Sequence, residues 1–77
     1  MSKQLRTTRH KRLMAALVET REKAGVTQRE LARRLGRAHS YVGRIETGDR
    51  RLDVPEFCEW CELLGANALD VLKKVVR

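Results

Sequence analysis

Apolar residues recur at the three-to-four-residue spacing of a helix face in five stretches of the chain. None of these stretches shows the strict alternation of apolar and polar residues that marks a strand. The pattern predicts a first helix over about 8–24, a second over 28–35 and a third between a turn at 36–38 and Gly48. A fourth runs from near Pro55 to Gly65, and a fifth over about 68–76.

Capping residues stand where these helices are expected to begin and end. Thr27 and Glu30 have the T-x-x-E spacing of a capping box at the start of the second helix. Gly36 suits the left-handed position that ends that helix. Pro55 fits a first helical turn, and Asn67 is an N-cap for the last helix. These signals favour a bundle of short helices with tight connections.

The segment 27–48 has the properties of one particular motif. Two short helices flank a tight turn, and the second helix keeps a polar, partly basic outer face. The inner angle is filled by Leu31, Ala32, Leu35, Val42 and Ile45. This is the description of a helix-turn-helix, whose second helix fits the major groove of DNA.

Charge is distributed unevenly along the chain. The net charge is +7, and residues 1–51 hold 14 Lys and Arg against 5 Asp and Glu. Residues 52–77 hold 3 against 5. A basic front and a mildly acidic back are typical of a protein that docks on a polyanion with one face, although surface charge also serves solubility. Because aromatic residues for base stacking are sparse, duplex DNA is a better candidate than RNA.

Several function classes find no support in the sequence. No apolar run approaches the roughly 20 residues of a membrane span, and the charged start lacks the apolar core of a signal peptide. We therefore expect a cytoplasmic protein without a membrane partner. No nucleophile with a base, no paired carboxylates and no Gly-rich phosphate loop is recognisable, so we expect no enzyme and no cofactor.

Cys58 and Cys61 form a C-x-x-C pair. A structural zinc site needs about four ligands, and His10 and His39 are the remaining His and Cys candidates. We expect no metal site. On the fourth helix both cysteines are expected to act as small hydrophobic residues on its apolar side.

Two runs within 12–72 resemble the lambda-repressor/Cro-like (XRE) family. They are R-E-K-A-G-V-T-Q-R-E-L-A-R-R-L-G and S-Y-V-G-R-I-E-T-G. The resemblance implies an all-α, five-helix, lambda-repressor-like bundle over 8–77, preceded by a basic arm at 1–7. It also implies a DNA-binding transcriptional regulator, a repressor in our interpretation, that acts on operator DNA as a homodimer. An antitoxin whose main partner is a toxin is the alternative, since antitoxins often use the same fold.

The resemblance assigns roles to individual residues. Gln28 matches the family's phosphate-contacting Gln, and Arg21 with Glu46 matches its structural ion pair. The positions from which the recognition helix reaches DNA bases are held by His39, Ser40, Gly43 and Arg44. Arg44 is the best candidate for reading guanine, with a phosphate contact as the alternative. Gly43 brings no side chain, so one base position is left unread.

Other residues are candidates for the phosphate backbone. Tyr41 either donates its hydroxyl to a phosphate or packs sideways against the third helix. Basic residues around this helix are expected to clamp the backbone, namely Arg37, Arg50 and Arg51. A groove-following arm is predicted from Lys3, Arg6, Arg9, Lys11 and Arg12, with a basic start of no function as the alternative.

A homodimer needs an interface away from the basic front. Leu69 and Leu72 are expected to fill the core. That leaves Val71 and Val75 uncovered, with Trp60 beside them, as the predicted dimer interface. In the alternative, all these side chains pack within one monomer.

Overall fold

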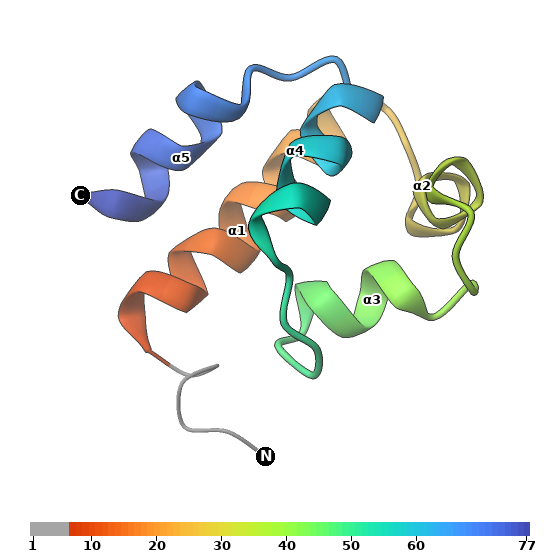
Figure 1. Cartoon of the computed structure of the whole chain (residues 1–77), viewed down its shortest axis with the longest axis horizontal. Coiled ribbons are helices and arrows are strands. Elements are labelled where there is room, and N and C mark those ends of the chain that lie inside the picture. The colour runs from red at the N-terminus through yellow and green to blue at the C-terminus, as the bar shows by residue number, and fades with distance from the viewer. Residues whose placement is uncertain (1–6) are drawn as a thin grey trace.

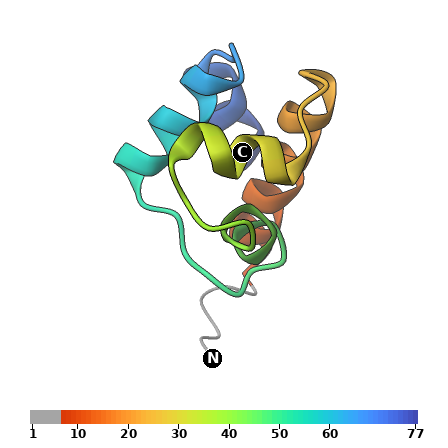
Figure 2. The same ribbon diagram turned by 90° about the vertical axis from the view of Figure 1, so that its right-hand side faces the viewer.

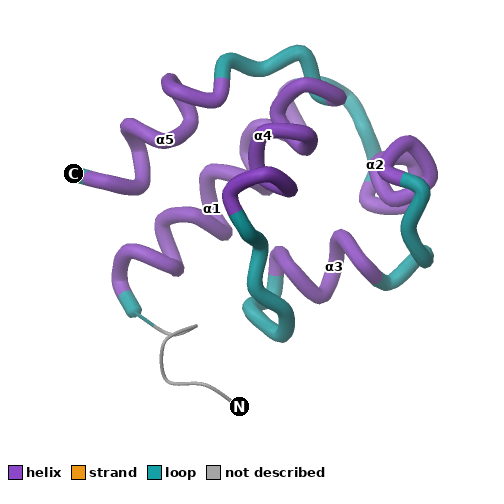
Figure 3. Tube along the Cα trace, in the orientation of Figure 1, coloured by secondary structure: helices purple, strands orange, loops and turns teal. Residues whose placement is uncertain are grey.

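The computed structural model describes residues 7–77, and its five helices are joined by short loops (Figures 1 and 3). The helices are α1 (Thr8–Lys23), α2 (Gln28–Leu35), α3 (Tyr41–Glu46), α4 (Val54–Leu63) and α5 (Ala68–Val76). No strand occurs between residues 7 and 77. The all-α, five-helix prediction is therefore confirmed, and α2 and α5 have the predicted bounds.

Side-chain caps explain where four of the helices begin. Thr7 accepts a hydrogen bond from the His10 backbone N–H at the start of α1, and Thr27 accepts one from the Glu30 backbone N–H at the start of α2. Asn67 does the same for Asp70 at the start of α5. At α4 a complete capping box is present that was not predicted, in which Asp53 and Glu56 each accept the other's backbone N–H. Each cap satisfies backbone donors that a helix cannot pair internally.

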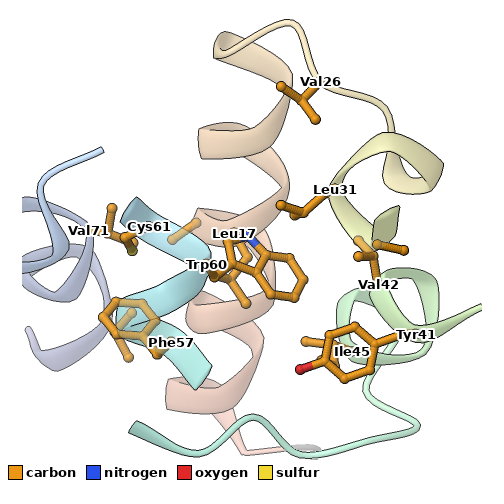
Figure 4. Packing of buried hydrophobic residues seen from close by; sticks show 13 residues of the cluster. Leu17, Val26, Leu31, Tyr41, Val42, Ile45, Phe57, Trp60, Cys61 and Val71 are labelled. Atoms are coloured by element: carbon orange, nitrogen blue, oxygen red, sulfur yellow. The ribbon is translucent and has the colours of Figure 1, made fainter. Parts of the chain in front are cut away.

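The core lies where all five helices meet, and Trp60 of α4 is at its centre (Figure 4). α1 packs against α3 and α5, while α2 packs against α3 and α4. The fully buried side chains include Leu17 of α1, Leu31 of α2 and Ile45 of α3. Leu31, Ala32, Val42 and Ile45 are buried as predicted, so the inner angle between α2 and α3 is part of this core.

The register predicted for α5 is wrong. Val71 and Val75 are 5% and 7% exposed, and they, not the leucines, face the core. Leu69 is 69% exposed, and it shares the outer face of α5 with Leu72 and Val76. The apolar residues of α5 cover more than one face, so the pattern alone does not choose which face is buried.

Helix α4 also departs from the prediction. Trp60 is fully buried and cannot line the predicted dimer interface. Cys61 is buried, and burial raises the pKa of its thiol, whereas Cys58 is exposed and does not belong to the apolar side. Phe57, Trp60 and Cys61 form the inner stripe of this helix, at the i, i+3, i+4 spacing.

No helix in the described part of the chain combines the length and the apolar character needed to cross a bilayer. Between residues 7 and 77, no three His, Cys, Asp or Glu side chains gather into a potential metal site.

The corrected register of α5 can be tested with two neighbouring valines. Val75→Ala removes buried methyl groups and leaves a cavity, so it should lower the free energy of unfolding by about 2 kcal/mol. Val76→Ala changes an exposed side chain and should stay within about 0.5 kcal/mol of wild type. Urea unfolding followed by circular dichroism measures both. Equal losses for the two variants would contradict this register.

Candidate nucleic-acid interface

The two helices α2 and α3 meet at a steep angle. In Figure 1 α2 is seen end-on while α3 lies across the view, and in Figure 2 the two exchange these roles. Gly36 ends α2 in the left-handed conformation, with φ of 70°. The Arg37 backbone N–H then donates to the Ala32 carbonyl and closes the turn. This arrangement is a helix-turn-helix, with the outer face of α3 turned away from the core.

One carboxylate fixes the far end of α3. Arg21 Nε donates to Glu46 Oε2 at 2.7 Å, and Arg21 Nη2 donates to Glu46 Oε1 at 3.1 Å. Arg21 Nη1 also donates to the Val26 carbonyl at 2.9 Å. The hydrogen bond from Arg21 to Glu46 raises the pKa of the guanidinium, which stays charged. The geometry therefore contains the predicted ion pair between α1 and α3, and both partners are largely buried.

Gln28 belongs to the same network. Its Nε2 donates to Glu46 Oε1 at 2.8 Å, so the side chain at the start of α2 is tied to the end of α3. Its Oε1 lies across α3, at 3.3 Å from the point where Gly43 would carry a Cβ. Because Gly43 has no side chain, the Gln28 side chain has room to lie there. From the sequence, only an unread base position was expected there.

Arg44 stands on the outer face of α3, Ser40 is the N-cap of this helix and His39 lies in the turn before it, and all three are exposed to solvent. Within residues 7–77 these three side chains make no hydrogen bond or ion pair, and Ser40 does not cap the helix. These are the side chains predicted to reach bases. They are placed together on one exposed surface, and their donors and acceptors are available to a ligand.

Tyr41 does not belong to that exposed surface, and its hydroxyl, predicted as a candidate for a phosphate, has a partner within the protein. The ring is buried beside Trp60, with the two ring centroids 6.5 Å apart. The hydroxyl donates to Glu56 Oε2 at 3.0 Å. Burial, followed by the hydrogen bond to the Glu56 carboxylate, raises the pKa of the Tyr41 hydroxyl. Tyr41 thus packs toward α4 and not sideways along α3.

The basic residues flanking α3 differ in their surroundings. Arg37 and Arg50 both make ion pairs with Glu56, a residue not singled out from the sequence. Asp53 and Glu56 have the D-x-x-E spacing of a capping box, and this spacing was the sequence signal that could have identified Glu56. Arg51 is exposed on the same loop as Arg50.

Two of the three basic residues of α2, Arg33 and Arg34, pair with Glu30 of the same helix, and Arg34 also donates to the Leu63 carbonyl of α4. Glu30 accepts hydrogen bonds from Arg33 and Arg34, which lower the pKa of its carboxyl to about 2. In the free protein both arginine side chains are therefore held by the Glu30 carboxylate.

The predicted basic arm is only partly within the structure. Lys3 and Arg6 lie outside the described residues. Thr7 is the cap of α1, and Arg9, Lys11 and Arg12 stand on α1 itself. Arg12 donates to the carbonyl of Arg77, so it joins α1 to the end of the chain.

Comparison with known proteins places this geometry in a family. A family model described as a helix-turn-helix domain matches residues 2–72. A solved structure, an XRE-family like protein from Pseudomonas syringae pv. tomato str. DC3000, is 42% identical and superposes with a TM-score of 0.84. The match covers 95% of this chain and 89% of that chain. This chain is a DNA-binding helix-turn-helix domain of the XRE type. No curated protein matches it.

The position of the Gln28 side chain across Gly43 in this XRE-type domain can be tested by a double-mutant cycle. A glycine inside a helix costs about 1 kcal/mol relative to alanine. Gly43→Ala should therefore stabilise the Gln28→Ala variant by about that amount. In the wild-type background the new methyl group meets Gln28 Oε1, so the gain should be smaller. Urea unfolding of the four proteins measures the difference, and equal gains in both backgrounds would rule out the contact.

Proposed function

We propose that this XRE-type domain is a transcriptional regulator that represses by occupying operator DNA. The observation that carries the proposal is the exposed surface formed by the outer face of α3 and the turn before it, where Arg44, Ser40 and His39 have no partner within residues 7–77. The hydrogen-bonding groups of these three side chains are therefore available to a ligand. The regulator acts by contact and displacement, with no chemical step and no cofactor.

In this mechanism α3 enters the major groove. Arg44 donates two parallel hydrogen bonds to a guanine edge, and Ser40 and His39 contact neighbouring bases or phosphates. Gln28, at the N-terminus of α2, donates to a phosphate with the amide proton that Glu46 does not use. The excess of basic residues in 1–51 supplies the attraction that does not depend on sequence.

The functional unit in this proposal is a homodimer. A single helix-turn-helix reads few base pairs, whereas two copies read half-sites one DNA turn apart. Since Trp60, Val71 and Val75 are buried, the interface is assigned instead to the outer stripe of α5. It consists of Leu69, Leu72 and Val76, which are exposed and lie within one helix face.

Binding to selected operator duplexes and to random duplexes tests the DNA-binding role. Arg44→Ala should cost about 1–3 kcal/mol on the operator and relax one base position. Gln28→Ala should weaken both kinds of duplex alike, because phosphates carry no sequence. The logarithm of wild-type affinity should fall with the logarithm of salt with a slope of at least about −4. Equal losses on operator and random DNA for Arg44→Ala would make Arg44 a phosphate contact.

Sedimentation at micromolar concentration, with and without a palindromic duplex, tests the dimer. Leu72→Glu places a charge in the outer stripe of α5 and should leave a folded monomer. Lys73→Gln, at the neighbouring exposed position, makes the same charge change of −1 and should still dimerise. A wild type that stays monomeric both free and on the palindrome would exclude the homodimer.

A further inference from the structure

Three side chains that the sequence assigned to DNA, those of Arg37, Tyr41 and Arg50, converge on the Glu56 carboxylate. Glu56 Oε2 accepts from the Tyr41 hydroxyl at 3.0 Å and from Arg37 Nη2 at 3.1 Å. Arg50 approaches the same carboxylate through Nη1, at 3.4 Å from Oε1, and through Nη2, at 3.3 Å from Oε2.

The two arginines come from opposite ends of α3. Arg37 lies in the turn before α3 and Arg50 in the loop after it. α3 has six residues and is about 9 Å long, so both side chains can reach the same ring. The guanidinium carbons of Arg37 and Arg50 lie 4.7 Å and 4.9 Å from the centroid of the Tyr41 ring. Stacking and ion pairing together hold both groups in place.

The carboxylate itself is anchored. Glu56 Oε1 accepts the Asp53 backbone N–H at 3.0 Å as part of the capping box of α4. That bond, with those from Arg50 and Tyr41, lowers the pKa of Glu56. The Glu56 side chain is only 14% exposed. It is therefore a fixed negative charge and not a mobile surface group.

The two arginines remain partly open to solvent. The Glu56 carboxylate faces both guanidinium groups, the Asp53 carboxylate also acts on Arg50, and the Arg37 and Arg50 side chains are 45% and 35% exposed. A guanidinium has five N–H donors, and Arg37 uses one of them on Glu56. An anion arriving from solvent finds two guanidinium groups with unused N–H donors in a fixed arrangement. A DNA phosphate provides that anion on either side of the groove that α3 enters.

We propose that Glu56 is a positioning residue of the DNA interface, which holds Arg37 and Arg50 as a fixed pair for phosphates flanking the groove. The inference rests on the proposed function, since it concerns the same DNA. The opposite interpretation is that Glu56 neutralises two arginines and weakens DNA binding. The two interpretations predict opposite signs when the charge of Glu56 is removed.

Glu56→Gln makes the protein more positive by one charge and removes the charged acceptor for both arginines. If Glu56 positions the pair, affinity for the operator should fall by on the order of tenfold despite the added charge. The slope of log affinity against log salt should become less steep by about 0.9 for each phosphate that the arginines no longer neutralise. Glu59→Gln is the matched control, because it makes the same charge change at an exposed position of α4. Its affinity should equal or slightly exceed that of wild type.

Fluorescence anisotropy of labelled operator over a salt series measures all proteins at a temperature where circular dichroism shows them folded. Arg37→Lys is the second variant, and it remains informative if Glu56→Gln does not fold. It keeps the charge but loses the planar fork and the stacking on Tyr41, so it should also lower affinity and slope. In the Arg37→Ala/Arg50→Ala protein, adding Glu56→Gln should cost no further affinity.

An affinity for Glu56→Gln that rises together with that of Glu59→Gln would overturn the proposal, and so would an unchanged affinity for Arg37→Lys. A further loss on adding Glu56→Gln to the arginine double variant would overturn it too. Failure of the wild type to bind any duplex would instead reject the proposed function, so the two failures are distinguishable.

Discussion

The hydrogen-bonded ion pair between Arg21 and the Glu46 carboxylate is the interaction on which the rest of the interface depends. The Glu46 carboxylate accepts hydrogen bonds from Arg21 of α1 and from Gln28 of α2, and Glu46 is the last residue of α3. Three helices are thus joined at one point. Removing one partner of such a pair leaves an uncompensated buried charge, which costs about 3–5 kcal/mol. In a chain of 77 residues with a small core, this is a large part of the stability.

A second carboxylate, Glu56, acts at the other end of α3. Through Tyr41 it connects the first residue of α3 to the first turn of α4. α3 has no side-chain cap, so its orientation depends on these two carboxylates and on the burial of Val42 and Ile45. The Glu46 side chain is buried at the end of α3, and Glu56 belongs to α4. The outer face of α3 and the turn before it are left to side chains that are predicted to reach bases, namely Arg44, Ser40 and His39.

Local signals made most of the fold predictable from sequence, and the errors arose where packing between distant segments decides. Caps such as Thr27 and Asn67 make hydrogen bonds that span three residues, so helix limits follow from them. The ion pair of Arg21 and Glu46 joins residues 25 positions apart and was accessible only through the family resemblance, which is confirmed. In α5 and at Tyr41, by contrast, the pattern allowed either face, and neighbouring helices select the buried one.

The surface that we propose for DNA binding is the outer face of α3, held in place by Glu46 and Glu56. Titration of the 15N-labelled protein with a selected operator duplex, followed by amide NMR shifts, tests this claim most directly. We expect the largest changes at Gln28, over residues 37–44 and in the loop 47–52, with small changes on the core side of α5. The largest changes on α1 or α4 away from these segments, or uniform changes over the whole chain, would contradict it.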